Sequence, residues 1–206
     1  MSETLTRREA NKARTREAVV SALRRLVVER PVHEITVDQL AEAAGISRRT
    51  FFNYYAGIAA VLVEVFSSHA EQMVEQIDHT LLAHDPLAAL RAFVREDGTD
   101  PEFLGWMAAL NCHGPHDEAS LAVERTVWAD LGAWLDTRLR NLLPSGTDPL
   151  YLTTLASSVM HAYSAAEKTW LAGRADPTHL TRADLAAFPD HLDRALGYLA
   201  NGFRPA

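Results

Sequence analysis

The sequence is poor in cysteine and contains no long apolar run. Because Cys112 is its single cysteine, no intramolecular disulfide can form, and we expect an intracellular, cytoplasmic protein. No stretch approaches the roughly 20 apolar residues that a membrane-spanning helix requires. The first residues also lack the apolar segment of a secretory signal. These absences argue against a secreted disulfide-stabilised protein and against a membrane protein.

Signatures of common enzyme sites are absent as well. The chain has no glycine-rich phosphate loop, no nucleophile elbow and no paired-histidine metal motif. We therefore predict no enzyme and no cofactor, although a site assembled from scattered residues stays open. Strand-type alternation is not found either, whereas apolar residues recur at helical spacing throughout. The predicted fold class is all-α.

Positive charge is concentrated at the N-terminal end of a chain whose net charge is −7. Residues 1–56 hold 10 Lys and Arg against 7 Asp and Glu, whereas residues 57–206 hold 10 against 20. A small basic head on a larger acidic body is expected when one end of a protein meets a polyanion. The alternative is an N-terminal segment that is basic only for solubility.

The stretch "ITVDQLAEAAGISRRTFFNYY" carries the signals of two short helices joined by a tight turn. Thr36 and Gln39 have the spacing of a capping box, which begins the first helix. Gly45 is placed to end that helix in the left-handed conformation, and Ser47 to cap the next one. Two short helices with a glycine-containing turn of three or four residues predict a helix-turn-helix.

The second of these helices, which begins after Ser47, combines cations and aromatic rings. In a helix-turn-helix its N-terminal residues approach base edges in the DNA major groove. Arg48 and Arg49 could each pair with guanine, while Thr50 and Asn53 suit thymine, adenine or phosphate. Phe51 and Tyr55, four residues apart, are expected to bury one face of the helix. The alternative is a solvated arginine pair beside ordinary packing residues.

The segment "ITVDQLAEAAGISRRTFFNYYAGIAAVL" resembles the N-terminal domain of TetR-family transcriptional regulators, over about residues 10–65. The resemblance implies an all-α homodimer with a helix-turn-helix DNA-binding domain in residues 1–56. Residues 57–206 would form a helical ligand-binding and dimerisation domain. It further implies a repressor that binds a palindromic operator in double-stranded DNA and is released by a small apolar effector. The last two long helices would pair across the dimer.

The resemblance and the chemistry above together select the residues expected to contact DNA. They comprise the start of the first short helix, the exposed positions of the second, and two cations of the preceding helix: Thr36, Val37, Asp38, Ser47, Arg48, Arg49, Thr50, Phe52, Asn53, Tyr54, Lys12 and Arg14.

One position departs from the family pattern. Ile58 stands where the family usually has a phosphate-contacting lysine, and one lost contact should flatten the salt dependence of binding by about one unit. This departure keeps an alternative open, namely a helical dimeric interaction protein with a degenerate DNA-binding head and no ligand control.

The rest of the chain reads as further helices. We expect one over residues 59–82, short helices after Asp85-Pro86 and Asp100-Pro101, and a long helix over 117–143. A helix from Asp148-Pro149 to residue 172 follows, and then residues 181–202, interrupted at Pro189.

Large apolar side chains of these helices are candidates for an effector pocket, because such pockets are lined mainly by apolar and aromatic groups. Any one of them can equally be a core residue. The candidates are Phe66, Met73, Phe93, Phe103, Trp106, Met107, Leu110, Trp128, Leu131, Trp134, Met160 and Tyr163.

The loop "NCHGPH" gathers three side chains that can bind metals, Cys112, His113 and His116. A structural zinc site needs four ligands, and no CxxC or second histidine pair stands nearby. We therefore predict no metal site, while sensing of a metal or an oxidant by this loop stays open.

Overall fold

The structure is a computed structural model that describes residues 7–96, 100–111, 118–174 and 180–204. Every regular element in these ranges is helical, which confirms the predicted all-α class. The helices are α1 (Arg7–Glu29), the 3-10 turn η1 (Val32–Glu34), α2 (Val37–Ala43), α3 (Arg48–Phe52), α4 (Ile58–Gln76), α5 (His79–His84), α6 (Pro86–Glu96), α7 (Pro101–Asn111), α8 (Glu118–Leu142), α9 (Pro149–Ala172), α10 (Arg182–Ala186) and α11 (Phe188–Ala200). None of the described helices is long and apolar enough to cross a membrane.

The chain divides into two compact units. The first comprises Met1–Val65 with Ala109–Val127, and the second comprises Phe66–Ala108 with Trp128–Ala206. Helices α4, α7 and α8 each contribute residues to both units. The domain limit predicted at residue 57 falls just before α4 begins at Ile58, and it stays a prediction about where the DNA-binding segment ends.

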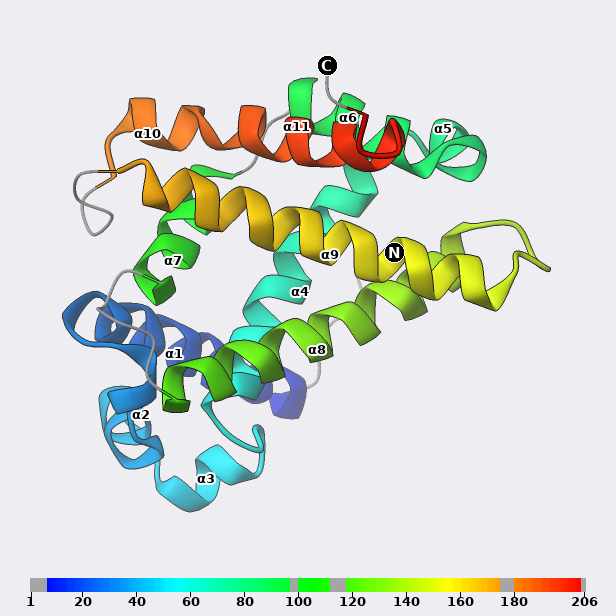
Figure 1. Cartoon of the computed structure of the whole chain (residues 1–206). Helices are drawn as coiled ribbons and strands as arrows, with labels where there is room; N and C mark the ends of the chain where they lie inside the picture. The colour runs from blue at the N-terminus through cyan, green and yellow to red at the C-terminus, as the bar shows by residue number, and fades with distance from the viewer. Residues whose placement is uncertain (1–6, 97–99, 112–117, 175–179, 205–206) are drawn as a thin grey trace. The chain divides into compact units, whose positions relative to one another are not determined.

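In the first unit α2 packs against both α1 and α3 (Figure 1). Val19 and Leu23 of α1 and Leu40 of α2 are fully buried, as their helical spacing requires. Arg25 of α1 donates a hydrogen bond from Nη2 to the carbonyl oxygen of Ala43, 3.0 Å away. Because Ala43 is the last residue of α2, this bond satisfies a carbonyl that has no partner within the helix.

The second unit is organised around α11, which packs against α9 and α6, while α5 packs against α6. Trp170 of α9 and Phe188 of α11 are almost fully buried, with ring centroids 5.2 Å apart in an edge-to-face arrangement. The Trp170 indole donates a hydrogen bond from Nε1 to the carbonyl oxygen of Asp184, at 2.8 Å. The indole N–H of this buried tryptophan thus finds its acceptor in α10, the short helix that precedes α11.

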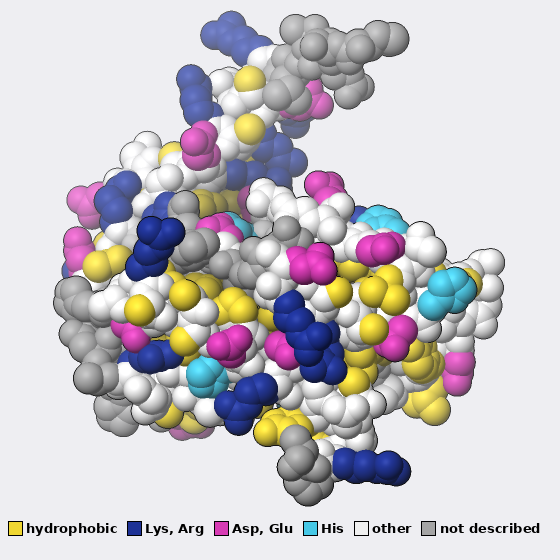
Figure 2. Space-filling view, turned by 90° about the horizontal axis from the view of Figure 1, so that it is seen from above, with side chains coloured by type: hydrophobic (Ala, Val, Ile, Leu, Met, Phe, Trp, Pro, Cys, Tyr) yellow, Lys and Arg dark blue, Asp and Glu magenta, His cyan; other side chains and the backbone are white. Residues whose placement is uncertain are grey.

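A charged cluster joins α6 to α11. Arg91 donates two hydrogen bonds to the carboxylate of Asp193, at 2.8 and 3.3 Å, and Arg95 adds a third at 3.0 Å. A Cβ at Gly197 would lie 3.2 Å from Nη2 of Arg91, so this glycine allows the guanidinium to approach α11. Figure 2 views the molecule from the side on which Figure 1 places α11, and shows charged and hydrophobic side chains interspersed there.

One predicted helix is divided in the structure, and one predicted interruption lies earlier than expected. The expected helix over residues 59–82 ends at Gln76, and Asp78 then caps α5 by accepting hydrogen bonds from the amides of Thr80 and Leu81. An aspartate at that position favours a new helix start over continuation. The interruption expected at Pro189 lies two residues earlier, at Ala187, since α10 ends at Ala186 and α11 begins at Phe188. Proline is tolerated in the first turn of a helix, where its missing N–H has no partner.

Candidate nucleic-acid interface

Helix α2 begins with the capping box that the sequence predicts. The Thr36 hydroxyl accepts a hydrogen bond from the Gln39 amide at 3.2 Å, and the Gln39 side chain accepts one from the Thr36 amide at 2.9 Å. Val37, the first helical residue, is half-buried, whereas Asp38 is exposed in the first turn. A carboxylate there is favoured by the partial positive charge of the helix N-terminus.

The turn between α2 and α3 depends on Gly45, whose φ is +68°. Its amide and that of Ile46 donate hydrogen bonds to the carbonyl oxygens of Glu42 and Ala41, which ends α2. Ser47 then caps α3 by accepting a hydrogen bond from the Thr50 amide at 3.0 Å. The Ser47 and Thr50 hydroxyls also lie 2.8 Å apart. The predicted helix-turn-helix is therefore present, with the glycine and both caps in their predicted roles.

Burial divides the aromatic residues of this segment into two groups. Phe51 is fully buried and Tyr55 is 4% exposed, and their rings lie 5.6 Å apart, which confirms their predicted burial, although α3 ends at Phe52 and Tyr55 lies beyond it. Phe52 is 46% exposed and meets the edge of Phe51, while Tyr54 is half-buried. Arg48, Arg49 and Asn53 are exposed, and Thr50 is half-buried. One face of α3 thus anchors the helix and the other offers donors to a partner.

The two arginines of α3 have different surroundings. Nη1 of Arg48 donates a hydrogen bond to Oδ2 of Asp38 at 2.7 Å, and its guanidinium carbon lies 5.3 Å from the ring centroid of Phe52. For Arg49, the described part of the chain provides no ion pair or side-chain hydrogen bond. Sequence reasoning selected both arginines and Asp38, but it did not foresee this pairing across ten residues.

A second polar group supports the end of the helix-turn-helix. The Tyr55 hydroxyl donates a hydrogen bond to Oε1 of Glu64 at 3.1 Å, and Nε of Arg16 lies 3.6 Å from Oε2 of the same carboxylate. Burial, and then the nearby Glu64 carboxylate, raises the pKa of Tyr55 far above its usual value. Tyr55 is therefore a neutral hydrogen-bond donor that ties the segment after α3 to α4.

The predicted cations of α1 are exposed. Lys12 and Arg14 both face solvent, with Nη2 of Arg14 donating to Oδ1 of Asn11 at 2.9 Å. Two other cations of this helix, Arg16 and Arg25, are engaged by Glu64 and by the Ala43 carbonyl. At the start of α4, Ile58 is half-buried. Some cations of the N-terminal segment therefore form contacts within the fold, while others leave positive charge on the surface.

The candidate effector-pocket residues other than Leu110 belong to the second unit, where they form smaller groups. Phe66 meets Phe103 edge-to-face at 5.4 Å, and the His69 ring stacks on Phe103 at 5.0 Å. The Tyr163 hydroxyl donates to Sδ of Met107 at 3.1 Å, and the rings of Tyr163 and Trp128 are 6.1 Å apart. The residues Phe93, Trp106 and Leu131 are buried, Met73, Trp134 and Met160 are half-buried, and the Leu110 side chain lies outside the described residues.

Sequence reasoning missed two neighbours of Tyr163. Phe188 lies 5.3 Å from it, and the Glu167 carboxylate is close enough to raise its pKa, after burial as the larger cause. Glu167 itself is only 2% exposed. The signal was available, because Tyr163, Glu167 and Trp170 recur at the spacing of one helix face. Phe188 gave no comparable signal, since it joins this cluster only through the packing of α11 on α9.

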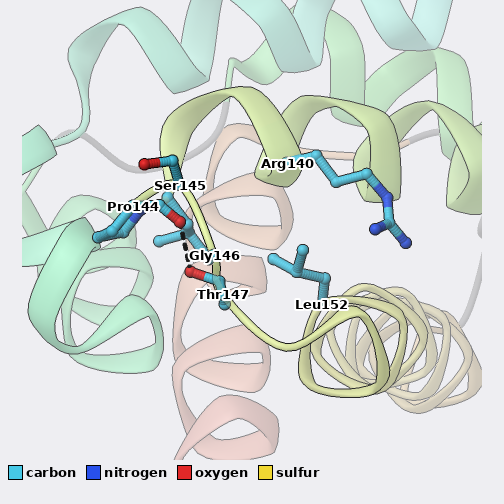
Figure 3. A pocket seen from close by; sticks show the side chains of 7 residues that line it. Arg140, Pro144, Ser145, Gly146, Thr147 and Leu152 are labelled. Atoms are coloured by element: carbon cyan, nitrogen blue, oxygen red, sulfur yellow. Dashed lines mark hydrogen bonds between the residues drawn. The ribbon is translucent and has the colours of Figure 1, made fainter.

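A hollow of about 220 Å³ lies elsewhere, at the turn from α8 to α9 (Figure 3). It is lined by Arg140, Leu143, Pro144, Ser145, Gly146, Thr147 and Leu152, which include none of the predicted pocket residues. Arg140 is held there by two hydrogen bonds to Asp136, at 2.7 and 3.1 Å. The hollow is small and its cation is neutralised, so it does not resemble an apolar effector site.

The three metal-competent residues of the sequence analysis, Cys112, His113 and His116, lie outside the described residues. Within the described ranges, no group of three His, Cys, Asp or Glu side chains is arranged to hold a metal ion.

Two short capped helices, a glycine turn, a buried aromatic face and an exposed cationic face define a helix-turn-helix domain. Residues 19–65 match the family model of "Bacterial regulatory proteins, tetR family". The chain therefore carries the helix-turn-helix domain of the tetR family, which confirms the resemblance predicted from the sequence.

Relatives with this domain are transcriptional regulators rather than enzymes. The chain is 38% identical over 71 residues to the HTH-type transcriptional regulator EthR of Mycobacterium tuberculosis, covering 34% of this chain and 31% of that one. It is 36% identical over 90 residues to the regulator NfxB of Pseudomonas aeruginosa, covering 43% and 46%. The matches thus span about a third to a half of the length of these relatives.

Among solved structures, the chain is similar to Thermus thermophilus FadR, a TetR-family transcriptional repressor solved in complex with lauroyl-CoA. The identity is 23%, the TM-score is 0.48, and the alignment covers 93% of this chain and 96% of that one.

Proposed function

We propose that this chain is a ligand-responsive transcriptional regulator, acting as a repressor in the cytoplasm. It binds a palindromic DNA operator as a homodimer and is released by a small apolar effector. The observation that carries the proposal is the division of α3 and the three residues after it into a buried side, with Phe51 and Tyr55, and an exposed side with Arg48, Arg49 and Asn53. This arrangement supports insertion of α3 into a major groove.

The proposed DNA contacts divide by chemistry. Arginine and asparagine side chains pair with base edges, so Arg48, Arg49 and Asn53 are proposed base readers, with Thr50 beside them. Hydroxyl groups and cations at the edge of the helix-turn-helix and on α1, and the backbone N–H groups at the start of α2, suit the phosphate backbone, which positions the protein without reading sequence. These proposed phosphate or groove contacts are Thr36, Val37, Asp38, Ser47, Phe52, Tyr54, Lys12 and Arg14.

The effector is proposed to bind among the aromatic and sulfur-containing side chains of the second unit. The cluster of Trp128, Tyr163 and Met107 supports an apolar ligand, because its surfaces are mainly aromatic and the Tyr163 hydroxyl already donates to Sδ of Met107. Large exposed apolar side chains on α9 and α11 support dimerisation through these helices. Leu150 is 73% exposed, Tyr151 46% and Tyr198 43%.

The test is a gel shift of the purified chain with the DNA that flanks its own coding sequence, at two salt concentrations. A sequence-specific shift that weakens at the higher salt is expected, because Lys and Arg contacts release counterions from DNA. Absence of any shift at low salt from a folded dimer, with random duplex DNA also unbound, would contradict the proposal. A shift on random DNA alone would place the operator elsewhere.

A second candidate function rests on Ile58. Helix α4 begins there without a cation, and the side chain is half-buried. This supports a helical dimeric interaction protein whose head no longer binds DNA tightly. A folded dimer that fails to bind random duplex DNA at low salt would favour this second function over the regulator.

A further inference from the structure

The ion pair between Arg48 and Asp38 lies on the surface that the proposed function assigns to DNA. Its Nη1–Oδ2 distance is 2.7 Å, and the two side chains are 59% and 66% exposed. Ion pairs as exposed as this contribute little to the stability of a fold. The main effect of this pair is therefore on the orientation of the Arg48 guanidinium and not on the stability of the fold.

Three helical positions together restrict the Arg48 side chain. Asp38, from the first turn of α2, accepts one hydrogen bond from the guanidinium, and the ring of Phe52 lies 5.3 Å from its central carbon. Phe52 is itself fixed edge-to-face against the fully buried Phe51. A long flexible side chain thus has an anion on one side and an aromatic ring on another, and both belong to capped helices.

Restriction of this kind matters for recognition of bases. Arginine reads guanine by donating two hydrogen bonds in a fixed fork, and its selectivity depends on the plane of the guanidinium. The bond to Asp38 occupies one of the five N–H donors and leaves enough for a bidentate contact. An arginine that is ordered before binding loses less conformational entropy on contact than a mobile one.

The same carboxylate has a cost on a DNA-binding surface. A negative charge on a DNA-facing surface repels phosphates whatever the base sequence. Arg49, the adjacent residue in the same helical turn, has no such anchor among the described residues and offers a matched comparison within the protein.

We propose that Asp38 is a positioning residue for base recognition, which holds Arg48 against Phe52 so that Arg48 pairs with a guanine edge. Arg49 then supplies mainly charge toward the backbone. The proposal rests on the proposed DNA-binding function and names the residues that determine its specificity. It also replaces the phosphate contact proposed for Asp38 with a role exerted through Arg48, and the base reading proposed for Arg49 with a contact to the DNA backbone.

The experiment begins with the unmodified full-length chain and a selection from randomised duplex DNA, which identifies its preferred sequence. The ratio of affinities for that sequence and for random duplex is then measured for each variant. We expect D38N to bind random duplex more tightly than the parent, since a repulsive charge is gone. We also expect its specificity ratio to fall about tenfold, the loss expected of one misdirected bidentate contact.

Three further variants separate positioning from a structural effect. R48K keeps the charge but loses the fork, so its ratio should fall as in D38N, and the double variant should fall no further. R49K also keeps the charge and should lose less of the ratio than R48K, because a charge contact survives the exchange. D38E restores the carboxylate and should recover part of the ratio. Melting temperatures of all variants control for folding, and R48K tests the proposal even where D38N fails to fold.

The outcomes distinguish this proposal from the function on which it rests. If the parent selects no preferred sequence, the proposed regulator function fails. If the parent is specific and D38N raises its affinity for all sequences equally, the carboxylate is only a neutralising charge and the positioning role is overturned. A larger loss of specificity in R49K than in R48K would overturn it as well.

Discussion

At the scale of single residues, Gly45 affects the stability of the turn, whereas Ile58 affects the proposed contact with the DNA backbone. Gly45 adopts φ +68°, and a Cβ added to it would meet no atom within 4 Å. The strain that a Cβ causes there therefore comes from the backbone and not from a clash of the Cβ with a neighbour. Position 58 has no such backbone constraint, so its effect lies in charge.

Replacing Gly45 by valine should destabilise the fold by about 1–3 kcal/mol, since a β-branched residue is strained at positive φ. Chemical denaturation measures the loss. Gly57→Val is the matched control, because Gly57 lies in equally open space without a positive φ. Equal midpoints for the Gly45 variant and the parent would show that the turn tolerates the strain.

Replacing Ile58 by lysine should add one phosphate contact at the start of α4. The slope of log affinity against log salt concentration is then expected to steepen by about one unit, with tighter binding at low salt. Ile58→Gln, which is polar but uncharged, serves as the control and should leave the slope unchanged. An unchanged slope in the lysine variant would mean that this helix end does not meet the DNA backbone.

At the scale of helices, the packing of α11 on α6 includes an ion pair that depends on pH. Hydrogen bonds from Arg91, and also from Arg95, hold the pKa of Asp193 below its usual value, although burial acts in the opposite direction. A carboxyl whose pKa is lower in the folded than in the unfolded state stabilises the fold above the unfolded pKa, near 4. That contribution is lost as the pH falls through the folded pKa.

Asp193→Asn should therefore reduce the free energy of unfolding at pH 7 by about 1–3 kcal/mol, because Arg91 loses its charged acceptor. The difference from the parent should shrink as the pH is lowered through and below 4. Denaturation midpoints at pH 7 and pH 3 measure it. Asp190→Asn, at an exposed position of the same helix, is the control and should show little effect at either pH. If Asp193→Asn and the parent differed in stability by the same amount at pH 7 and pH 3, the ionised carboxylate would have no role.

At the scale of the whole molecule, DNA binding and effector binding are expected to be coupled. All four tryptophans, Trp106, Trp128, Trp134 and Trp170, follow the proposed DNA-binding segment of residues 1–56. Indole fluorescence therefore reports on the proposed effector region directly.

An effector that releases DNA should change tryptophan emission, and operator DNA should weaken effector binding by the same factor by which effector weakens DNA binding. Effector titrations followed by tryptophan emission, with and without operator, measure the first factor. Gel shifts with and without effector measure the second. Sedimentation should give twice the chain mass of 22.8 kDa. Unequal factors, or a monomer that binds DNA at full affinity, would contradict the coupled dimer.

Much of the helix-turn-helix could be predicted because its signals are local. Thr36 and Gln39 are three residues apart, Ser47 and Thr50 likewise, and Gly45 acts through its own φ. The end of α4 was predicted wrongly for a related reason. The apolar spacing of residues 59–82 continues past Gln76, while the decisive signal was the single capping side chain of Asp78.

The sequence by itself determined the all-α class, the basic head, the position of the two short helices and the buried pair Phe51 and Tyr55. Helical spacing and capping act over three or four residues, so a linear pattern contains them. Only the tertiary structure decided that Arg48 pairs with Asp38, that Arg91 meets Asp193 across 102 residues, and that Phe188 lies beside Tyr163. Such contacts depend on how helices pack, and many partners of equal chemistry compete for each side chain until the packing selects one.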